Sequence, residues 1–77
     1  MNKYKIEIES RINTNIFNHI AAIFSKRHAE IESYHKNEEN GFYRICIEAP
    51  ADTKSRIAIK DLMHHNDIIS VKSYPAA

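Results

Sequence analysis

The chain is 77 residues long, which limits it to one domain, and it contains 43% hydrophobic and 27% charged residues. These proportions are typical of a folded globular domain and unlike those of disordered chains. Eleven Lys and Arg residues are interspersed with ten Asp and Glu residues, so the formal net charge is only +1. This balance argues against a nucleic-acid-binding surface and against a surface for anionic lipid.

The N-terminal residues lead directly into an alternating pattern without a signal-peptide apolar block, and the apolar stretches of the chain are short. Cys46 is the only cysteine, so an internal disulfide is impossible and a reducing compartment is expected. We therefore expect residues 1–77 to form a single cytoplasmic domain that does not enter a membrane.

The first predicted elements are a strand and a helix. Residues 4–9 alternate between apolar and charged side chains, which predicts a strand with one buried face. Asn13, Thr14 and Asn15 offer side-chain oxygens for a helix cap, and apolar residues then recur at spacings of three to four. The pattern predicts a helix over residues 14–28.

The middle of the chain is predicted to form a β-hairpin. Residues 29–36 alternate weakly and are polar, as suits a sheet edge, and residues 37–41 predict the turn. Residues 42–49 predict the next strand, with Tyr43 on the buried face and Arg44 and Cys46 on the other. Pro50 is expected to end this strand.

The C-terminal part predicts a second helix and a last strand. The helix begins at Asp52 or Thr53 and runs to about His65. Its narrow apolar stripe comprises Ile59, Leu62 and Met63. The strand covers residues 67–74, with Ile69 and Val71 facing inward and Lys72 facing outward.

The order strand, helix, strand, strand, helix, strand predicts an α+β fold of the ferredoxin-like βαββαβ type. Because the two crossover connections are right-handed, the four strands form an antiparallel sheet with both helices on one face. The outward sheet positions carry charges of both signs, which predicts a solvated or partner-facing surface. They are Lys5, Glu7, Glu9, Arg44 and Lys72.

No catalytic, metal or cofactor site is predicted. The first loop lacks the cysteine pair of a copper carrier, and Arg44 stands where an RNA recognition motif would place a stacking ring. His64 and His65 are adjacent on a helix end, so they point about 100° apart and are poorly placed to share a metal ion. Cys46 is interpreted as a small hydrophobe. We therefore expect a protein that is not an enzyme.

Two segments carry a resemblance to a known family. Residues 16–33 look like the first helix and second strand of an ACT domain, in particular that of the acetolactate synthase small subunit. Residues 59–71 resemble the ending of the same domain, and with the strands the resemblance covers roughly residues 4–74. Each element alone is common, so the resemblance is moderately specific.

The resemblance implies a noncatalytic regulatory subunit of branched-chain amino-acid biosynthesis. In that family two ACT domains form a dimer, bind valine near the first loop and helix start, and raise the activity of a large subunit that carries thiamine diphosphate and FAD. The implied partners are a second copy, joined through helices and the edge strand around Ile31–His35, and an acetolactate synthase catalytic subunit. The ligand-binding residues that we infer are Asn13, Asn15, Ile16, Glu30 and Ile31.

The first loop departs from the amino-acid-binding pattern of the family. Asn15 stands at the position of a glycine, Ile12 at that of an asparagine, and Glu30 at that of the asparagine that opens the second strand. A side chain at residue 15 would crowd a ligand, and a carboxylate at residue 30 would repel the carboxylate of an amino acid. The loop is more similar to the short, valine-insensitive version of the subunit, so we expect weak or absent valine feedback.

Three alternatives stay open at the level of the sequence. One alternative is a freestanding ACT-type sensor of an amino acid or another small molecule, and another is a pairing domain that serves assembly alone. Asn13 and Asn15 are also explained by helix capping without any ligand.

Overall fold

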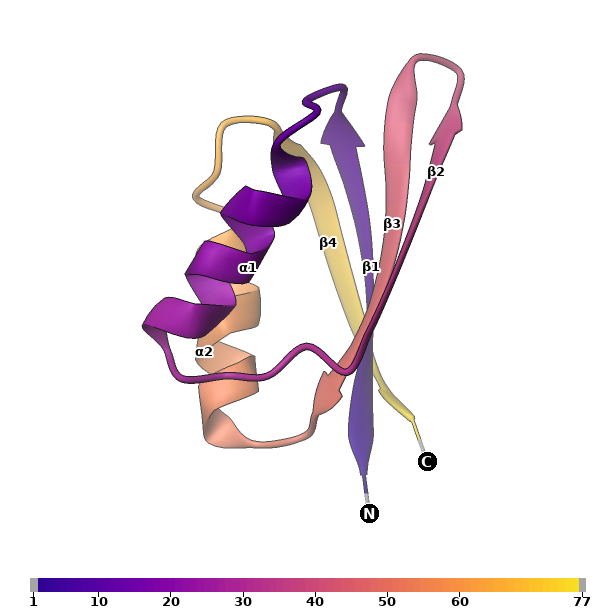
Figure 1. Ribbon diagram of the computed structural model, residues 1–77. Helices are drawn as coiled ribbons and strands as arrows, with labels where there is room; N and C mark the ends of the chain where they lie inside the picture. Colours follow the sequence, from indigo (N-terminus) through magenta and orange to yellow (C-terminus); the bar gives the residue numbers. More distant parts are fainter. Residues whose placement is uncertain (1, 77) are drawn as a thin grey trace.

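The computed structural model describes residues 2–76. Its elements are, in chain order, β1 (Lys3–Arg11), α1 (Ile16–Lys26), β2 (Ser33–Glu39), β3 (Phe42–Pro50), α2 (Thr53–Leu62) and β4 (Ile68–Ala76). The strands form one antiparallel sheet in the order β2-β3-β1-β4, and both helices lie on the same side of it (Figure 1). The predicted ferredoxin-like βαββαβ fold is therefore confirmed.

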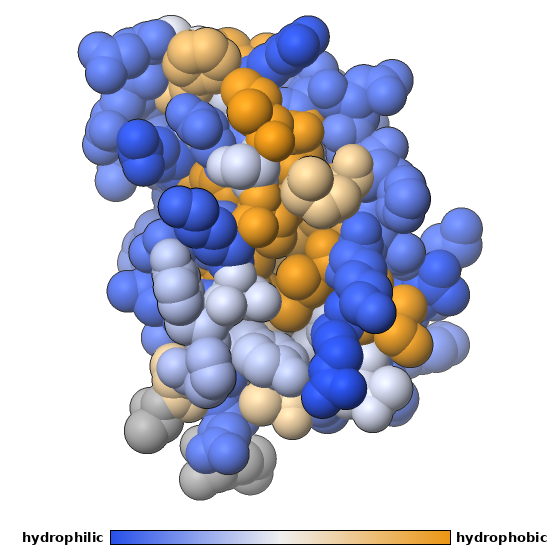
Figure 2. Space-filling model, turned by 180° about the vertical axis from the view of Figure 1, so that it is seen from behind, coloured by the Kyte–Doolittle hydropathy of each residue, from blue (hydrophilic) through white to orange (hydrophobic). Residues whose placement is uncertain are grey.

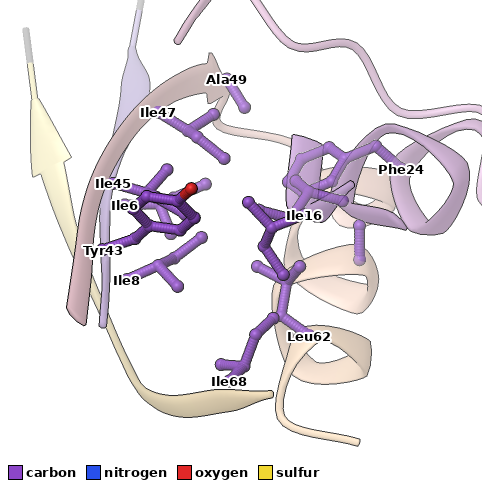
Figure 3. Packing of buried hydrophobic residues seen from close by; sticks show 12 residues of the cluster. Ile6, Ile8, Ile16, Phe24, Tyr43, Ile45, Ile47, Ala49, Leu62 and Ile68 are labelled. Carbon is purple, nitrogen blue, oxygen red and sulfur yellow. The ribbon is translucent and has the colours of Figure 1, made fainter. Parts of the chain in front are cut away.

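The core lies between the sheet and the two helices. Alternate side chains of β1 and β3 point from the sheet toward α1 and α2, as the period of a strand requires (Figure 3). The buried apolar residues are Ile6, Ile8, Ile16, Ile20, Phe24, Tyr43, Ile45, Ile47, Ala49, Ala58, Leu62 and Ile68. This core confirms the inward faces predicted for the first and third strands.

The opposite face of the sheet is open and charged. Glu9 lies directly opposite Arg44 on β3, and Glu7 lies opposite Lys72 on β4. Opposite charges on neighbouring strands attract, so this face is stable in water without a second layer. Cys46 lies in the same face and is partly exposed.

Helix α1 is shorter than the predicted 14–28. It starts after Asn15 and ends at Lys26 with Arg27 as its C-cap. The chain then reverses at His28, which has a φ of 57°, and the N–H of Ala29 donates to the carbonyl of Phe24. Such a left-handed residue with a bond back to the last turn is a common way for a helix to end.

The second strand also differs from its prediction. It begins at Ser33 rather than Ala29 and continues to Glu39, so the predicted turn over residues 37–41 shortens to Asn40–Gly41. These two residues have φ values of 54° and 82°. Positive φ at both central residues is the geometry that matches the twist of a two-residue hairpin, and it lets the strands pair up to the turn.

Helix α2 starts as predicted but has a different buried face. The carboxylate of Asp52 accepts a hydrogen bond of 2.8 Å from the N–H of Ser55, which fixes the first turn. The helix ends at Leu62 rather than His65, and it buries Ser55, Ala58 and Leu62. The prediction that Met63 belongs to the apolar stripe is wrong, because Met63 follows the last helical residue and is 52% exposed.

The sequence prediction assigned the wrong isoleucine to the inward face at the start of β4. Ile68 lies opposite Ser10 and Ser70 lies opposite Glu9, so Ile69 is an extra residue in β4. This bulge turns Ile68 inward and leaves Ile69 42% exposed, whereas the prediction placed Ile69 in the core. Beyond the bulge the prediction holds, since Val71 packs against the core.

Candidate functional site

The loop between β1 and α1 is organised by the side chain of Asn13. Its Oδ1 accepts a hydrogen bond of 2.9 Å from the N–H of Asn15, and its Nδ2 donates to Oδ2 of Asp67 at 2.7 Å. The carbonyl of Asn13 accepts from the N–H of Ile16 at 3.0 Å. Asn13 therefore holds the start of α1 in place, and both ends of its amide are occupied within the chain.

The loop between α2 and β4 is hydrogen-bonded to the loop between β1 and α1. The carbonyl of Asp67 accepts from the N–H of Arg11 at 2.8 Å, and the N–H of Asp67 donates to Nδ1 of His65 at 3.1 Å. The ring of His65 lies 4.7 Å from that of His19 on α1. Asp67 and His65 thus tie the first turns of α1 to the end of α2.

The inferred ligand-binding residues fall into two groups at opposite ends of α1. Asn13 and Asn15 precede the helix, while Glu30 and Ile31 follow it (Figure 1). An α-helix of 11 residues is about 16 Å long, so the two groups do not meet within one chain. The side chain of Ile16 is fully buried in the core, so this residue can offer a ligand only its backbone.

Backbone N–H groups at the start of α1 remain available. Those of Asn15 and Ile16 donate to Asn13, whereas the next two helical residues, Phe17 and Asn18, have no acceptor within the helix. Such N–H groups attract a carboxylate or another anion. The arrangement can bind and orient a small anion.

An apolar groove runs along the flank formed by α1 and the segment before β2. Its lining residues are Phe17, Ala21, Phe24, Ser25, His28, Ala29 and Ile31. Phe17 is 43% exposed, and its ring lies edge-on to that of Tyr34 on β2, with centroids 4.6 Å apart. Burial raises the pKa of Tyr34, with a smaller contribution from Tyr43. We call this surface the α1/β2 flank.

The structure also brings together side chains that the sequence did not associate. His19 and His65 are 46 positions apart, and Asn13 and Asp67 are 54 apart, so no local pattern could have paired them. Phe17 carried a signal, since it is a large apolar residue that directly follows buried Ile16 and lies beside the apolar stripe of α1. Within residues 2–76 no three His, Cys, Asp or Glu side chains are placed to hold one metal ion.

No protein-family model matches the sequence, and no curated protein sequence matches it. Solved structures do match. The ACT domain of a GTP pyrophosphokinase from Chlorobium tepidum is similar with a TM-score of 0.73 and 18% identity, over 94% of this chain and 96% of that one. The small subunit of acetolactate synthase from Thermotoga maritima has a TM-score of 0.76 and 18% identity.

The second match covers 92% of this chain but 46% of the small subunit, so the chain spans about half the length of that protein. The C-terminal domain of the MgtC protein from Mycobacterium tuberculosis is also similar, with a TM-score of 0.76, 12% identity and coverage of 99% and 88%. Identities this low establish the fold of ACT domains and no more than the fold. In the described part of the chain, no helix is long and apolar enough to span a membrane.

Proposed function

We propose that this chain is a noncatalytic ACT-type regulatory domain that acts as a homodimer and activates acetolactate synthase as its small subunit. The observation that carries the proposal is the placement of the candidate ligand residues at opposite ends of α1, with the apolar α1/β2 flank between them. In this proposal a second copy completes the divided site.

The geometry of such a dimer follows from the α1/β2 flank. β2 is an edge strand, and an unpaired edge beside an apolar groove favours association with another chain. In a two-fold dimer the same patch of each copy meets its counterpart. With the two β2 edges antiparallel, the neighbouring α1 helices also run in opposite directions. Asn13 and Asn15 of one copy would then face Glu30 and Ile31 of the other.

Weak or absent valine feedback is part of the proposal. The amide of Asn13 is engaged with Asp67 and Asn15, which leaves one N–H and one lone pair of this amide for a ligand. Glu30 is exposed, and across the proposed dimer its carboxylate would oppose the carboxylate of an amino acid. These features favour a role in activating the catalytic subunit over a role in valine inhibition.

The experiment that tests the proposal mixes the purified chain with a candidate acetolactate synthase catalytic subunit from the same source. Acetolactate formation is measured with and without the chain, and with and without valine. We expect a higher rate on adding the chain and little effect of valine. If the rate does not rise and the two proteins do not co-elute, the activating role is wrong.

A freestanding sensor is the second candidate, favoured by the available N–H groups at the start of α1. It predicts that an amino acid raises the melting temperature of the isolated chain, since a ligand that binds only the folded state stabilises it. A thermal-shift screen of amino acids therefore separates the two candidates. Stabilisation without any effect on a catalytic subunit would favour the sensor.

A further inference from the structure

An apolar strip is exposed on the flank opposite the α1/β2 flank. It runs between β4 and α2 and is bordered by hydrophilic side chains on both sides (Figure 2). Met63 and Ile69 are 52% and 42% exposed, and Ile59 and Val71 are partly exposed where they pack on the core. We call these four residues the α2/β4 strip. Contiguous exposed apolar surface that is rimmed by polar groups is typical of an interaction site.

Basic residues border the α2/β4 strip on its α2 side. Arg56 and Lys60 lie on the same side of α2 as Met63, given 3.6 residues per turn. Lys72 of β4 lies on the open face of the sheet, opposite Glu7. β4 contains no acidic residue. The single carboxylate of α2, Asp61, is bound to Arg27 at 2.6 Å, and this hydrogen bond lowers its pKa. The strip therefore favours a partner with acidic residues around an apolar stripe.

A second copy of the chain does not fit this strip as well. Two features make β4 a poor edge for pairing with another strand. One is the bulge at Ile69, and the other is Pro75, which has no backbone N–H to donate. An isologous dimer formed through the α1/β2 flank also leaves the other flank of each copy free. The strip remains available to a different chain.

We propose that the α2/β4 strip binds an amphipathic helical segment of a partner protein, whose apolar stripe is bordered by acidic residues. The apolar stripe packs against Met63, Ile69 and Val71, and the acidic residues face Arg56 and Lys60 of α2. Under the proposed function, on which this assignment of the partner rests, the segment belongs to the catalytic subunit.

The first test measures binding to the candidate catalytic subunit. Met63→Glu should weaken binding about ten-fold or more, because it places an unpaired negative charge against an acidic partner. Lys60→Glu should also weaken binding and reduce its salt dependence, whereas the matched control Lys54→Glu, on the opposite side of α2, should not. Each variant must keep the mass of the wild-type assembly. Unchanged binding by Met63→Glu and Lys60→Glu overturns the proposal.

A second test does not depend on the proposed function. A labelled helical peptide of about 15 residues, with leucines along one face and glutamates on both sides, is compared with a peptide that carries lysines instead. We expect the glutamate peptide to bind at least about ten-fold more tightly, and Met63→Glu to abolish the difference. No preference overturns the proposal, and so does binding to phosphatidylserine vesicles that Met63→Glu abolishes. If the wild-type chain fails to bind the catalytic subunit, the proposed function is wrong but the peptide result still decides the role of the strip.

Discussion

At the residue scale, Asp67 makes more connections than its position in a short loop suggests. Its carbonyl, carboxylate and N–H contact Arg11, Asn13 and His65, so one residue joins the β1–α1 loop to the α2–β4 loop. A partly buried amide that loses its acceptor destabilises the folded state, because water hydrated it in the unfolded chain. The conformation of the candidate site therefore depends on a residue outside it.

Asp67→Ala should lower the free energy of unfolding by about 1–2 kcal/mol, because Nδ2 of Asn13 then lacks its acceptor. Asp67→Asn keeps an oxygen at the same place and should recover part of this loss. Urea denaturation of both variants measures the difference. Equal stability of Asp67→Ala and the wild type would mean that the hydrogen bond contributes nothing.

Asp52 gives a prediction about pH. The N–H of Ser55 donates to its carboxylate, and this bond holds the pKa of Asp52 below its usual value of 3.8. A lowered pKa stabilises the folded state above pH 3.8, and this contribution is lost as the pH falls through the lower, folded value. We expect the wild type to be more stable than Asp52→Asn at about pH 7 and the two to converge toward about pH 2. Thermal unfolding across this range measures the gap, and a gap that does not change with pH would contradict the assignment.

At the element scale, the bulge in β4 decides which isoleucine joins the core. A regular strand would place Ile69 and Val71 on one face, whereas the extra residue lets Ile68 and Val71 face inward together. The result is a longer apolar contact for the end of α2 and an exposed Ile69 on the α2/β4 strip. The bulge thus places Ile68 in the core and Ile69 on the surface.

Alanine substitutions at the two isoleucines separate these roles. Ile68→Ala should lower the free energy of unfolding by about 2–4 kcal/mol, because it removes buried methyl groups and leaves a cavity. Ile69→Ala should cost about 1 kcal/mol or less, because the side chain is largely in water. Chemical denaturation measures both. The reverse order would mean that β4 pairs without the bulge.

At the scale of the whole molecule, the two flanks of the sheet differ in character. The α1/β2 flank has an apolar groove beside a free strand edge, and the α2/β4 strip is apolar with a basic border. A thin sheet with helices on one side has few places to gain stability, and association at its flanks is one of them. Under the two proposals, two different partners bind one small domain at the same time.

Phe17→Glu should convert the proposed dimer into a monomer. The substitution places a charge in the centre of the α1/β2 flank, while the 43% exposure of Phe17 allows the monomer to fold. Sedimentation or light scattering gives the mass of each protein, and circular dichroism checks the fold. Asn18→Glu, also exposed on α1 but outside the groove, is the matched control. A wild-type chain that is already monomeric would rule out this use of the flank.

The sequence alone determined the order of the elements and the inward faces of β1 and β3, because Ile6, Ile8, Ile45 and Ile47 follow the period of a strand without interruption. It also limited the cap of α2 to Asp52 or Thr53, of which the structure shows Asp52, since capping depends on a residue and its near neighbours. Local chemistry was sufficient for these features.

Only the tertiary structure decided the bulge at Ile69, the exposure of Met63 and the contact of Asn13 with Asp67. Each of these depends on residues that meet across the fold, where β4 pairs with β1 and the two loops come together. The same holds for the candidate site, whose residues the sequence grouped but whose two halves lie at opposite ends of α1. Periodicity reports which face of an element is apolar, whereas pairing register and loop contacts are set by the packing of distant segments.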